Sequence, residues 1–281
     1  MTAMWPVSYA DASARINSAQ IPQGVKLGIS AFTATAEAFR EVLTGPMSRG
    51  EVSTEVSARV PKALTYECRS CKARHVAGNV WQHSGLAGAV EVQSRGKDAT
   101  LGPIKNLPGP PTANDGIEGL LTTYLRLLGP ATPVEAAKYL GSSTAEIRKV
   151  WPDDLAEVSV DGRKAWLPAA ALAELKSAKP VSGVRLVPPM DALLQARDRD
   201  LLVPDKKQQK EVWRTLGNPG VLLLDGEIAG VWRAKMAGSK RVDLTVTSFG
   251  SLTAKARKAI DAEAAEVARG RGAREATVSY S

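Results

Sequence analysis

The sequence predicts an α+β fold, in which two related helical modules precede a carboxy-terminal part rich in β-strands. The first observation is an internal repeat, because GPMSRGEVS at residues 45–53 returns as GPATPVEAA at residues 129–137. Each copy follows an apolar stretch with helical spacing and contains a capping box, a Ser or Thr with a Glu three residues later. After about residue 179 the pattern changes to short aliphatic runs separated by Gly-containing turns, which is typical of strands.

Residues 1–111 contain the first copy and are predicted to form the first domain. The apolar spacing of 35–43 predicts a helix that ends at a Gly-Pro pair, and the capping box at Ser48 opens a second helix that Pro61 ends. The further elements expected here are a strand at 63–67, a helix at 76–86, and a hairpin of 90–92 with 99–101. Closely spaced prolines between 103 and 111 predict a linker.

Residues 112–178 are predicted to form the second domain. An apolar stripe runs along 117–128, and Thr132 caps the next helix with Pro133 at the favoured first position. Gly141 ends that helix, and a further capping box opens a third helix through Trp151. The segment 158–167 carries a central Asp-Gly and reads as a hairpin. Helix, helix, glycine turn, helix and hairpin in this order predict a winged helix-turn-helix domain, and the repeat predicts two in tandem.

Residues 179–281 are predicted to form a β-meander or barrel-like domain with a helix near its end. The strands are expected at 184–187, 220–224, 228–232, 241–246 and 277–280, and the helix at 253–269. A small barrel, or a sheet packed on that one helix, fits this order.

Charge favours a polyanionic partner. The chain has 37 Lys and Arg against 29 Asp and Glu, a net charge of +8, which attracts phosphates in a salt-sensitive way. No apolar run approaches the roughly 18 residues of a membrane span, and the first residues lack the features of a signal peptide. We therefore expect no membrane partner, and a location in the cytoplasm, at the nucleoid when bound to DNA.

The second domain supplies most of the predicted DNA contacts. In its third helix Ile147, Val150 and Trp151 take one face, which leaves outward-facing residues for a major groove and its phosphates. The hairpin tip adds two cations, and the hairpin of the first domain offers two more at the equivalent place. The residues predicted to bind double-stranded DNA are Arg95, Lys97, Thr144, Arg148, Lys149, Arg163 and Lys164. The alternative is that these winged helices are protein-interaction or spacer modules with solvated cations.

All the cysteines and histidines of the chain lie between residues 68 and 83: Cys68, Cys71, His75 and His83. Zinc accepts a Cys2His2 set, but the longer spacer that usually precedes the histidine pair is missing. The alternatives are reduced thiols at a strand turn with histidines near nucleic acid, or a redox pair, which lacks a βαβ context. From the sequence we assign no metal site and expect no small-molecule cofactor.

No catalytic residue can be assigned. The sequence holds no Ser-His-Asp order, phosphate loop or dinucleotide fingerprint. The alternating charges of 197–200 could do acid–base work, although an Arg-Asp lattice that braces two domains fits them better.

Seven short motifs resemble those of a bacterial family of winged helix DNA-binding domain-containing proteins that includes the AlkZ-type DNA glycosylases. They are CRSCKARH at 68–75, YLRLLGPATP at 124–133, VW at 150–151, VPPMD at 187–191, RDRD at 197–200, GNPG at 217–220 and GVWR at 230–233. The resemblance spans about residues 5 to 270. It implies tandem winged helices arranged as an open C around DNA, with an additional β-barrel. The resemblance also implies that characterised relatives remove alkylated or crosslinked bases by hydrolysing the N-glycosidic bond.

One departure limits what the resemblance implies. The glycosylases carry a Gln-aliphatic-Gln or Gln-aliphatic-Asp motif in an amino-terminal winged helix, and this chain has no such triplet. We interpret the chain as beginning after that region. The sequence thus predicts a DNA-binding protein related to repair glycosylases, with an active glycosylase and an interaction scaffold as the alternatives.

Overall fold

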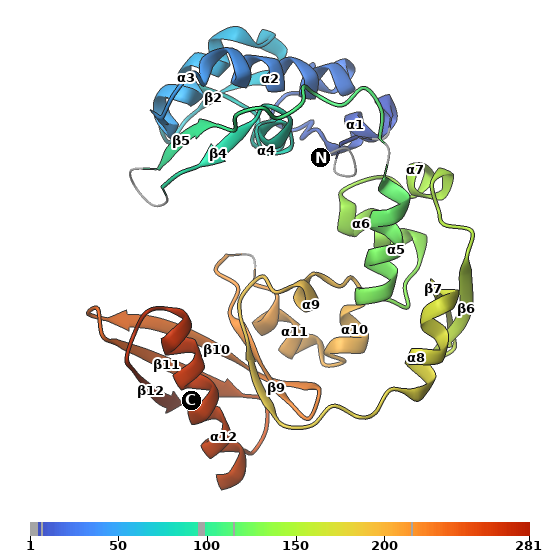
Figure 1. Ribbon diagram of the computed structural model, residues 1–281, viewed down its shortest axis with the longest axis vertical. Helices are drawn as coiled ribbons and strands as arrows, with labels where there is room; N and C mark the ends of the chain where they lie inside the picture. Colours follow the sequence, from blue (N-terminus) through green and yellow to red (C-terminus); the bar gives the residue numbers. More distant parts are fainter. Residues whose placement is uncertain (1–4, 7, 95–98, 115, 215) are drawn as a thin grey trace. The chain divides into compact units, whose positions relative to one another are not determined.

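The computed structural model describes residues 5–6, 8–94, 99–114, 116–214 and 216–281, which excludes the predicted contacts Arg95 and Lys97. The chain divides into two compact units, residues 1–168 and 169–281 (Figure 1). Among the described residues, no helix is long and apolar enough to cross a membrane.

The first part of the amino-terminal unit is a helical module around Phe32, Phe39, Val52 and Val56, which are all inaccessible to solvent. Its elements are α1 (Tyr9–Arg15), η2 (Gly24–Leu27), α2 (Ile29–Val42), β1 (Met47–Ser48), α3 (Arg49–Arg59), η3 (Lys62–Leu64), β2 (Thr65–Cys68), β3 (Ala73–Val76), α4 (Gly78–Ala87), β4 (Val90–Val92) and β5 (Thr100–Pro103). The helices expected at 48–60 and 76–86 are confirmed as α3 and α4. The helix expected at 35–43 is α2, which begins six residues earlier than predicted.

The capping box that opens α3 is formed as predicted. The backbone N–H of Glu51 donates to Ser48 Oγ at 3.2 Å, and Glu51 Oε2 accepts from the Ser48 N–H at 3.0 Å. Both interactions satisfy amide groups that a helix start leaves without partners. The repeat therefore marks a real helix boundary.

The second part of this unit has its own core, in which Leu121, Leu125 and Ile147 are fully buried. Its elements are α5 (Ile117–Leu128), α6 (Pro133–Leu140), α7 (Thr144–Lys149), β6 (Leu155–Val160) and β7 (Arg163–Pro168). Every one of them follows from the sequence, including the left-handed Gly141 that ends α6 and the positive φ angles of Asp161 and Gly162 in the hairpin turn.

The two parts share a further feature that the repeat alone does not predict. Met47, two residues after the first repeat begins, pairs with Leu101 of the hairpin β4–β5. Ala131, at the same place in the second repeat, forms a bridge with Trp166 of the hairpin β6–β7. In both parts one inter-helix link, α2 to α3 in the first and α5 to α6 in the second, is thus paired with the hairpin.

The two parts differ in the segment that precedes their last helix, α4 or α7. Only a short turn around Gly141 joins α6 to α7, whereas the hairpin β2–β3 is inserted between α3 and α4. Helix α1 then joins the two parts: Ser8 Oγ donates to Glu146 Oε2 at 2.7 Å, and Ser142 Oγ donates to Asp11.

The carboxy-terminal unit is an open sheet rather than the barrel-like domain that the sequence favoured. Its elements are η4 (Ala169–Ala171), α8 (Leu172–Ser177), β8 (Val184–Val187), α9 (Ala192–Gln195), α10 (Arg199–Leu202), α11 (Lys206–Val212), β9 (Gly220–Leu224), β10 (Glu227–Ala237), β11 (Arg241–Ser248), α12 (Ala254–Gly270) and β12 (Glu275–Tyr280). The strand order is β12-β11-β10-β9-β8, so within the described residues β8 and β12 are the two edges and no barrel closes.

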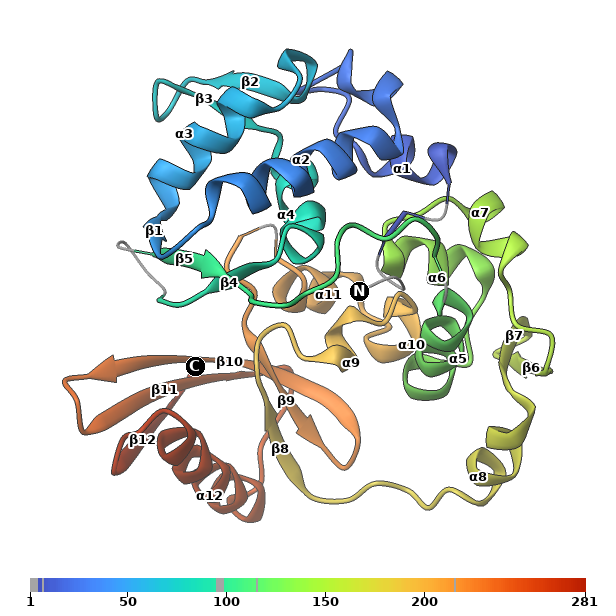
Figure 2. The same ribbon diagram turned by 45° about the horizontal axis from the view of Figure 1, so that its top comes forward.

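The two faces of the sheet are covered unequally. Ile260 and Ala264 of α12 are buried against Leu222 and Leu244 on one face, as the alternative of a sheet packed on one helix implied. On the other face the segment α9–α11, which the sequence did not predict, packs only on β9 and the start of β10, where it buries Leu194 together with Val221 and Val231 (Figure 2). The remainder of that face carries exposed polar side chains, such as Lys235, Thr245 and Thr277.

Candidate nucleic-acid interface

Helix α7 presents Arg148 outward, as predicted. Ile147 is fully buried, and Arg148, the next residue, is exposed and has no hydrogen bond or ion pair in the part of the chain that the structure describes. Thr144 begins the helix and is half-buried. Arg148 is therefore the cation of α7 with the greatest freedom to meet a ligand.

Lys149 is held by a neighbouring carboxylate. Its Nζ lies 2.7 Å from Glu146 Oε1, and the Glu146 side chain is almost fully buried, at 4% exposure. Hydrogen bonds from Lys149 and from Ser8 hold the pKa of Glu146 below its ordinary value. Glu146 was predicted to close a capping box with Ser143, but the structure forms only half of it. Ser143 Oγ accepts from the Glu146 N–H, while the carboxylate turns to Ser8 and Lys149.

The two predicted cations of the hairpin also differ from each other. Arg163 Nη1 donates to both oxygens of Glu135, at 3.2 and 3.1 Å, and the same carboxylate completes the capping box of Thr132. Lys164 pairs with Glu157 at 2.8 Å, but both side chains are largely exposed, at 73% and 47%. Exposed pairs of this kind contribute about 0–1 kcal/mol, so Lys164 can exchange its partner at little cost.

Arg148 and Lys164 line the same pocket. This pocket, of about 530 Å³, lies between the start of α6, the end of α7 and strand β7. Its described lining is Thr132, Pro133, Val134, Arg148, Trp151, Lys164 and Trp166. We call it the cationic pocket, because this lining contains two cations and no carboxylate.

Trp151 packs against the core with Ile147 and Val150, as predicted, but the sequence did not predict that Trp151 and Trp166 also line this pocket. Trp151 and Trp166 are both half-buried, so part of each ring faces the pocket. The signal was present for Trp166, because residues two apart on a strand share a face and Lys164 precedes it by two. Aromatic rings beside cations form surfaces on which nucleic-acid bases or sugars can pack.

The first module has a pocket at the equivalent place. It has a volume of about 540 Å³ and is formed by the start of α3, by α4 and by the hairpin β4–β5. Its described lining is Phe39, Arg49, Trp81, Gln82, Gly85, Leu86, Val90, Val92, Ala99 and Leu101. This pocket is mainly apolar with one cation, so the two modules offer different chemistry from one position of the fold.

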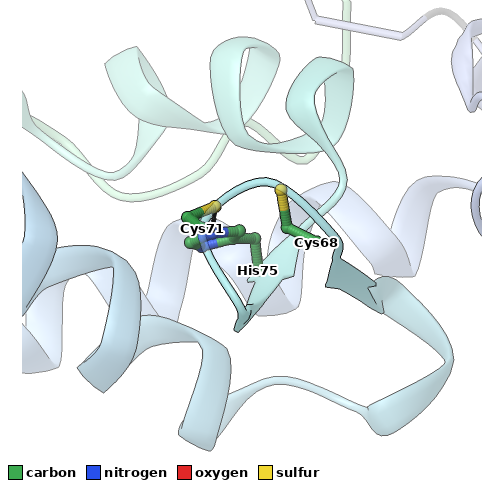
Figure 3. Close-up of side chains that lie close together, drawn as sticks. All are labelled: Cys68, Cys71 and His75. Carbon is green, nitrogen blue, oxygen red and sulfur yellow. Dashed lines mark hydrogen bonds between the residues drawn. The ribbon is translucent and has the colours of Figure 1, made fainter.

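The structure brings three of the four cysteine and histidine residues together. The Sγ atoms of Cys68 and Cys71 and a ring nitrogen of His75 all lie within 4.8 Å of one another, at the turn of the hairpin β2–β3 (Figure 3). Hydrogen bonding from Cys71 lowers the pKa of the Cys68 thiol to about 6 and raises the pKa of Cys71. His83 lies apart from this cluster. Its ring packs edge-on against Phe32 with the ring centroids 5.9 Å apart, and burial lowers the pKa of His83.

Comparisons with known proteins agree with the resemblance noted in the sequence. Residues 2–269 match the family described as DNA glycosylase AlkZ-like. An interstrand DNA cross-link repair glycosylase from Streptomyces sahachiroi is 32% identical over 171 residues, which are 58% of this chain and 44% of that protein. The chain is thus aligned to less than half the length of this relative.

A solved structure gives the corresponding likeness in three dimensions. The Streptomyces sahachiroi DNA glycosylase AlkZ is similar with a TM-score of 0.66 and 23% identity, over the whole of this chain and 77% of that one. At this identity the likeness concerns the fold.

Proposed function

The chain belongs to the AlkZ-like DNA glycosylase family, and on that premise we propose that it is a DNA-repair protein that binds double-stranded DNA through the cationic pocket. The observation that carries this proposal is the composition of that pocket. Arg148 and Lys164 line it together with two tryptophans, and no carboxylate is among its described lining residues. A surface of this kind attracts a phosphate backbone and offers aromatic faces beside it.

We further propose that residues 1–111 and 112–178 are tandem winged helix-turn-helix domains and that 179–281 form a third domain. Three features support this division. Each of the first two parts has a separate core, each has three helices (α2–α4 or α5–α7) that precede a hairpin, and each pairs one inter-helix link with that hairpin. In this reading the hairpins are the wings, and α4 and α7 are the helices that face the groove.

The predicted contacts have unequal roles in this proposal. Arg148 and Lys164 contact phosphates directly, because neither is committed to a buried carboxylate. Arg163 and Lys149 act mainly within the protein, where Arg163 holds the Glu135 carboxylate that caps α6 and Lys149 holds the Glu146 carboxylate that bonds Ser8. Thr144, Arg95 and Lys97 remain predicted contacts.

Fluorescence anisotropy with a labelled duplex, measured over a range of salt concentrations, tests the proposal. Each lost phosphate contact reduces the magnitude of the slope of log K against log salt concentration by about 0.9. It also weakens binding about eightfold at 0.1 M salt. We expect each of the variants Arg148→Glu and Lys164→Glu to show at least that loss. The matched control is Lys255→Glu, which makes the same charge change at an exposed position of α12 outside the pocket.

Two outcomes would contradict the proposal. If Lys255→Glu weakens binding as much as the pocket variants do, the attraction is only a general effect of net charge. If the wild-type chain does not bind the duplex even at low salt, the interaction scaffold becomes the better reading.

The second candidate function is a DNA glycosylase that excises alkylated or crosslinked bases, with which the family match is compatible. Such an enzyme needs an amide or carboxylate that orients water against C1′ of the sugar as positive charge develops there, and we assign no residue to this role. The test is release of bases from methylated and crosslinked duplexes, followed by hot alkali to cleave at abasic sites. Absence of strand breaks at enzyme concentrations that saturate the duplex would remove this candidate without affecting DNA binding.

A further inference from the structure

The hairpin β2–β3 is an insertion that the second module lacks. It lies between α3 and α4, where the second module has only the short turn around Gly141. Its two strands are four residues each. A two-stranded hairpin of this size is marginally stable by itself, so a further restraint on it is expected.

The tip of this hairpin gathers ligands suited to zinc. Cys68 ends β2, Cys71 lies in the turn and His75 lies on β3, so the three side chains converge at one end of the hairpin (Figure 3). Their ligand atoms lie within 4.8 Å of one another, and Cys71 Sγ is 2.8 Å from His75 Nε2. Tetrahedral zinc with Zn–S bonds of about 2.3 Å separates its ligand atoms by about 3.5–3.8 Å. Small side-chain rotations therefore suffice to bring the three atoms to that spacing.

A serine on the neighbouring helix orients the histidine for this role. His75 Nδ1 lies 2.9 Å from Ser53 Oγ, and Ser53 belongs to α3. When Nδ1 carries the proton and donates it to Ser53 Oγ, the lone pair of Nε2 faces the two sulfur atoms. Histidine ligands of metals are usually fixed by a hydrogen bond of this kind on the other ring nitrogen.

The surroundings suit two thiolates. Arg69 and Lys72 flank Cys71 in the sequence, and the nearest carboxylate along the hairpin, Glu67, is paired with Arg74 at 2.6 Å. Lys72 has a φ of 52°, in the left-handed region, directly after Cys71. This reversal of the backbone returns the chain to β3 and brings His75 beside the thiols.

We propose that Cys68 Sγ, Cys71 Sγ and His75 Nε2 bind one Zn²⁺ ion, which closes the tip of the inserted hairpin. The fourth coordination position faces solvent, since Cys71 is exposed, and water fills it. The ion replaces the two thiol protons, and its charge balances the two thiolates. None of the three ligand residues lines the cationic pocket.

Cobalt titration of the full-length, reduced chain after removal of metals by a chelator tests this site. Co²⁺ bound to thiolates in a tetrahedral site gives thiolate-to-metal charge-transfer absorption and visible d–d bands, and Zn²⁺ added afterwards abolishes both. We expect saturation at about one ion per chain. The variants Cys68→Ser and Cys71→Ser should each lose most of the charge-transfer absorption.

Two further variants separate this site from its alternatives. Ser53→Ala removes only the hydrogen bond to His75, and we expect metal affinity to fall by about 10- to 100-fold. His83→Gln changes the remaining histidine and should leave the cobalt spectrum unchanged, which distinguishes three protein ligands from a Cys2His2 set.

The cobalt spectrum of the wild-type chain tests the metal site even where a variant fails to fold. A reduced wild-type chain that shows no charge-transfer band overturns the proposal, as does a Cys71→Ser variant with the wild-type spectrum. A chain that binds no cobalt when reduced and forms a Cys68–Cys71 disulfide in air would show that the pair is a redox couple instead.

Discussion

The ion pair inside α1 provides a stringent test of how the amino-terminal unit is held together. Asp11 and Arg15 lie one helical turn apart with Oδ2 and Nη2 at 2.8 Å, and their side chains are only 0% and 2% exposed. Asp11 also accepts a hydrogen bond from Ser142, which belongs to the second module. The substitution Asp11→Ala would leave the Arg15 guanidinium buried without this carboxylate. Breaking a buried pair in this way costs about 3–5 kcal/mol.

A second pair in the same unit gives a matched control. Glu55 and Arg59 have the same spacing on α3 and approach to 2.6 Å, but they are 48% and 41% exposed. The substitution Glu55→Ala should therefore lower the free energy of unfolding by no more than about 1 kcal/mol. A double variant, Asp11→Ala with Arg15→Met, also removes the buried guanidinium charge and should recover most of the loss.

Equilibrium unfolding in urea, followed by circular dichroism and by tryptophan fluorescence, measures all three variants. The two probes are needed because the chain has more than one compact unit and its unfolding need not be a single transition. If Asp11→Ala loses no more stability than Glu55→Ala, burial does not make the Asp11–Arg15 pair more important than an exposed pair. If the double variant remains as unstable as the single one, the buried Arg15 charge is not the cause of the loss.

Two further predictions concern the helices that border the cationic pocket. Because hydrogen bonds from Lys149 and Ser8 lower the pKa of Glu146, its ionised form stabilises the folded state above the ordinary pKa of about 4.3, and this contribution is lost as the pH falls below it. Urea unfolding between pH 6 and 3 (the range set by that ordinary value) should thus show a smaller loss of stability in Glu146→Gln than in the wild type, and equal losses would contradict this. Thr132→Ala removes the cap of α6 and should lower stability by about 1 kcal/mol, whereas an unchanged urea midpoint would show that the cap is not needed.

Local signals in the sequence predicted the helical modules well. The capping box at Ser48, the capping Thr132 and the turn at Asp161 are each decided by residues within a few positions of one another, so their structure follows from nearby chemistry. Periodicity likewise gave α5 its observed bounds, because its apolar stripe is continuous over three turns.

Contacts between distant residues account for what the sequence did not predict. Glu146 leaves its expected capping box for Ser8, which is 138 residues away, and no local pattern signals that partner. The short helices α9–α11 have few turns over which a period could show, and they are defined by the sheet face that they cover. Arg148 and Lys164 line one pocket only because of the fold, so the sequence identified both cations but not the two tryptophans that line the pocket with them.

Photocrosslinking tests directly whether the cationic pocket contacts bound DNA. Val134 lines the pocket and is 44% exposed, so a photoreactive phenylalanine analogue can replace it without removing any charge. Leu127 on α5 is 70% exposed, does not line the pocket and serves as the control position in the same module. If the pocket binds DNA, the yield of crosslinks to a bound duplex should be much higher from position 134 than from position 127. Equal yields at both positions, with the duplex saturated, would contradict this expectation.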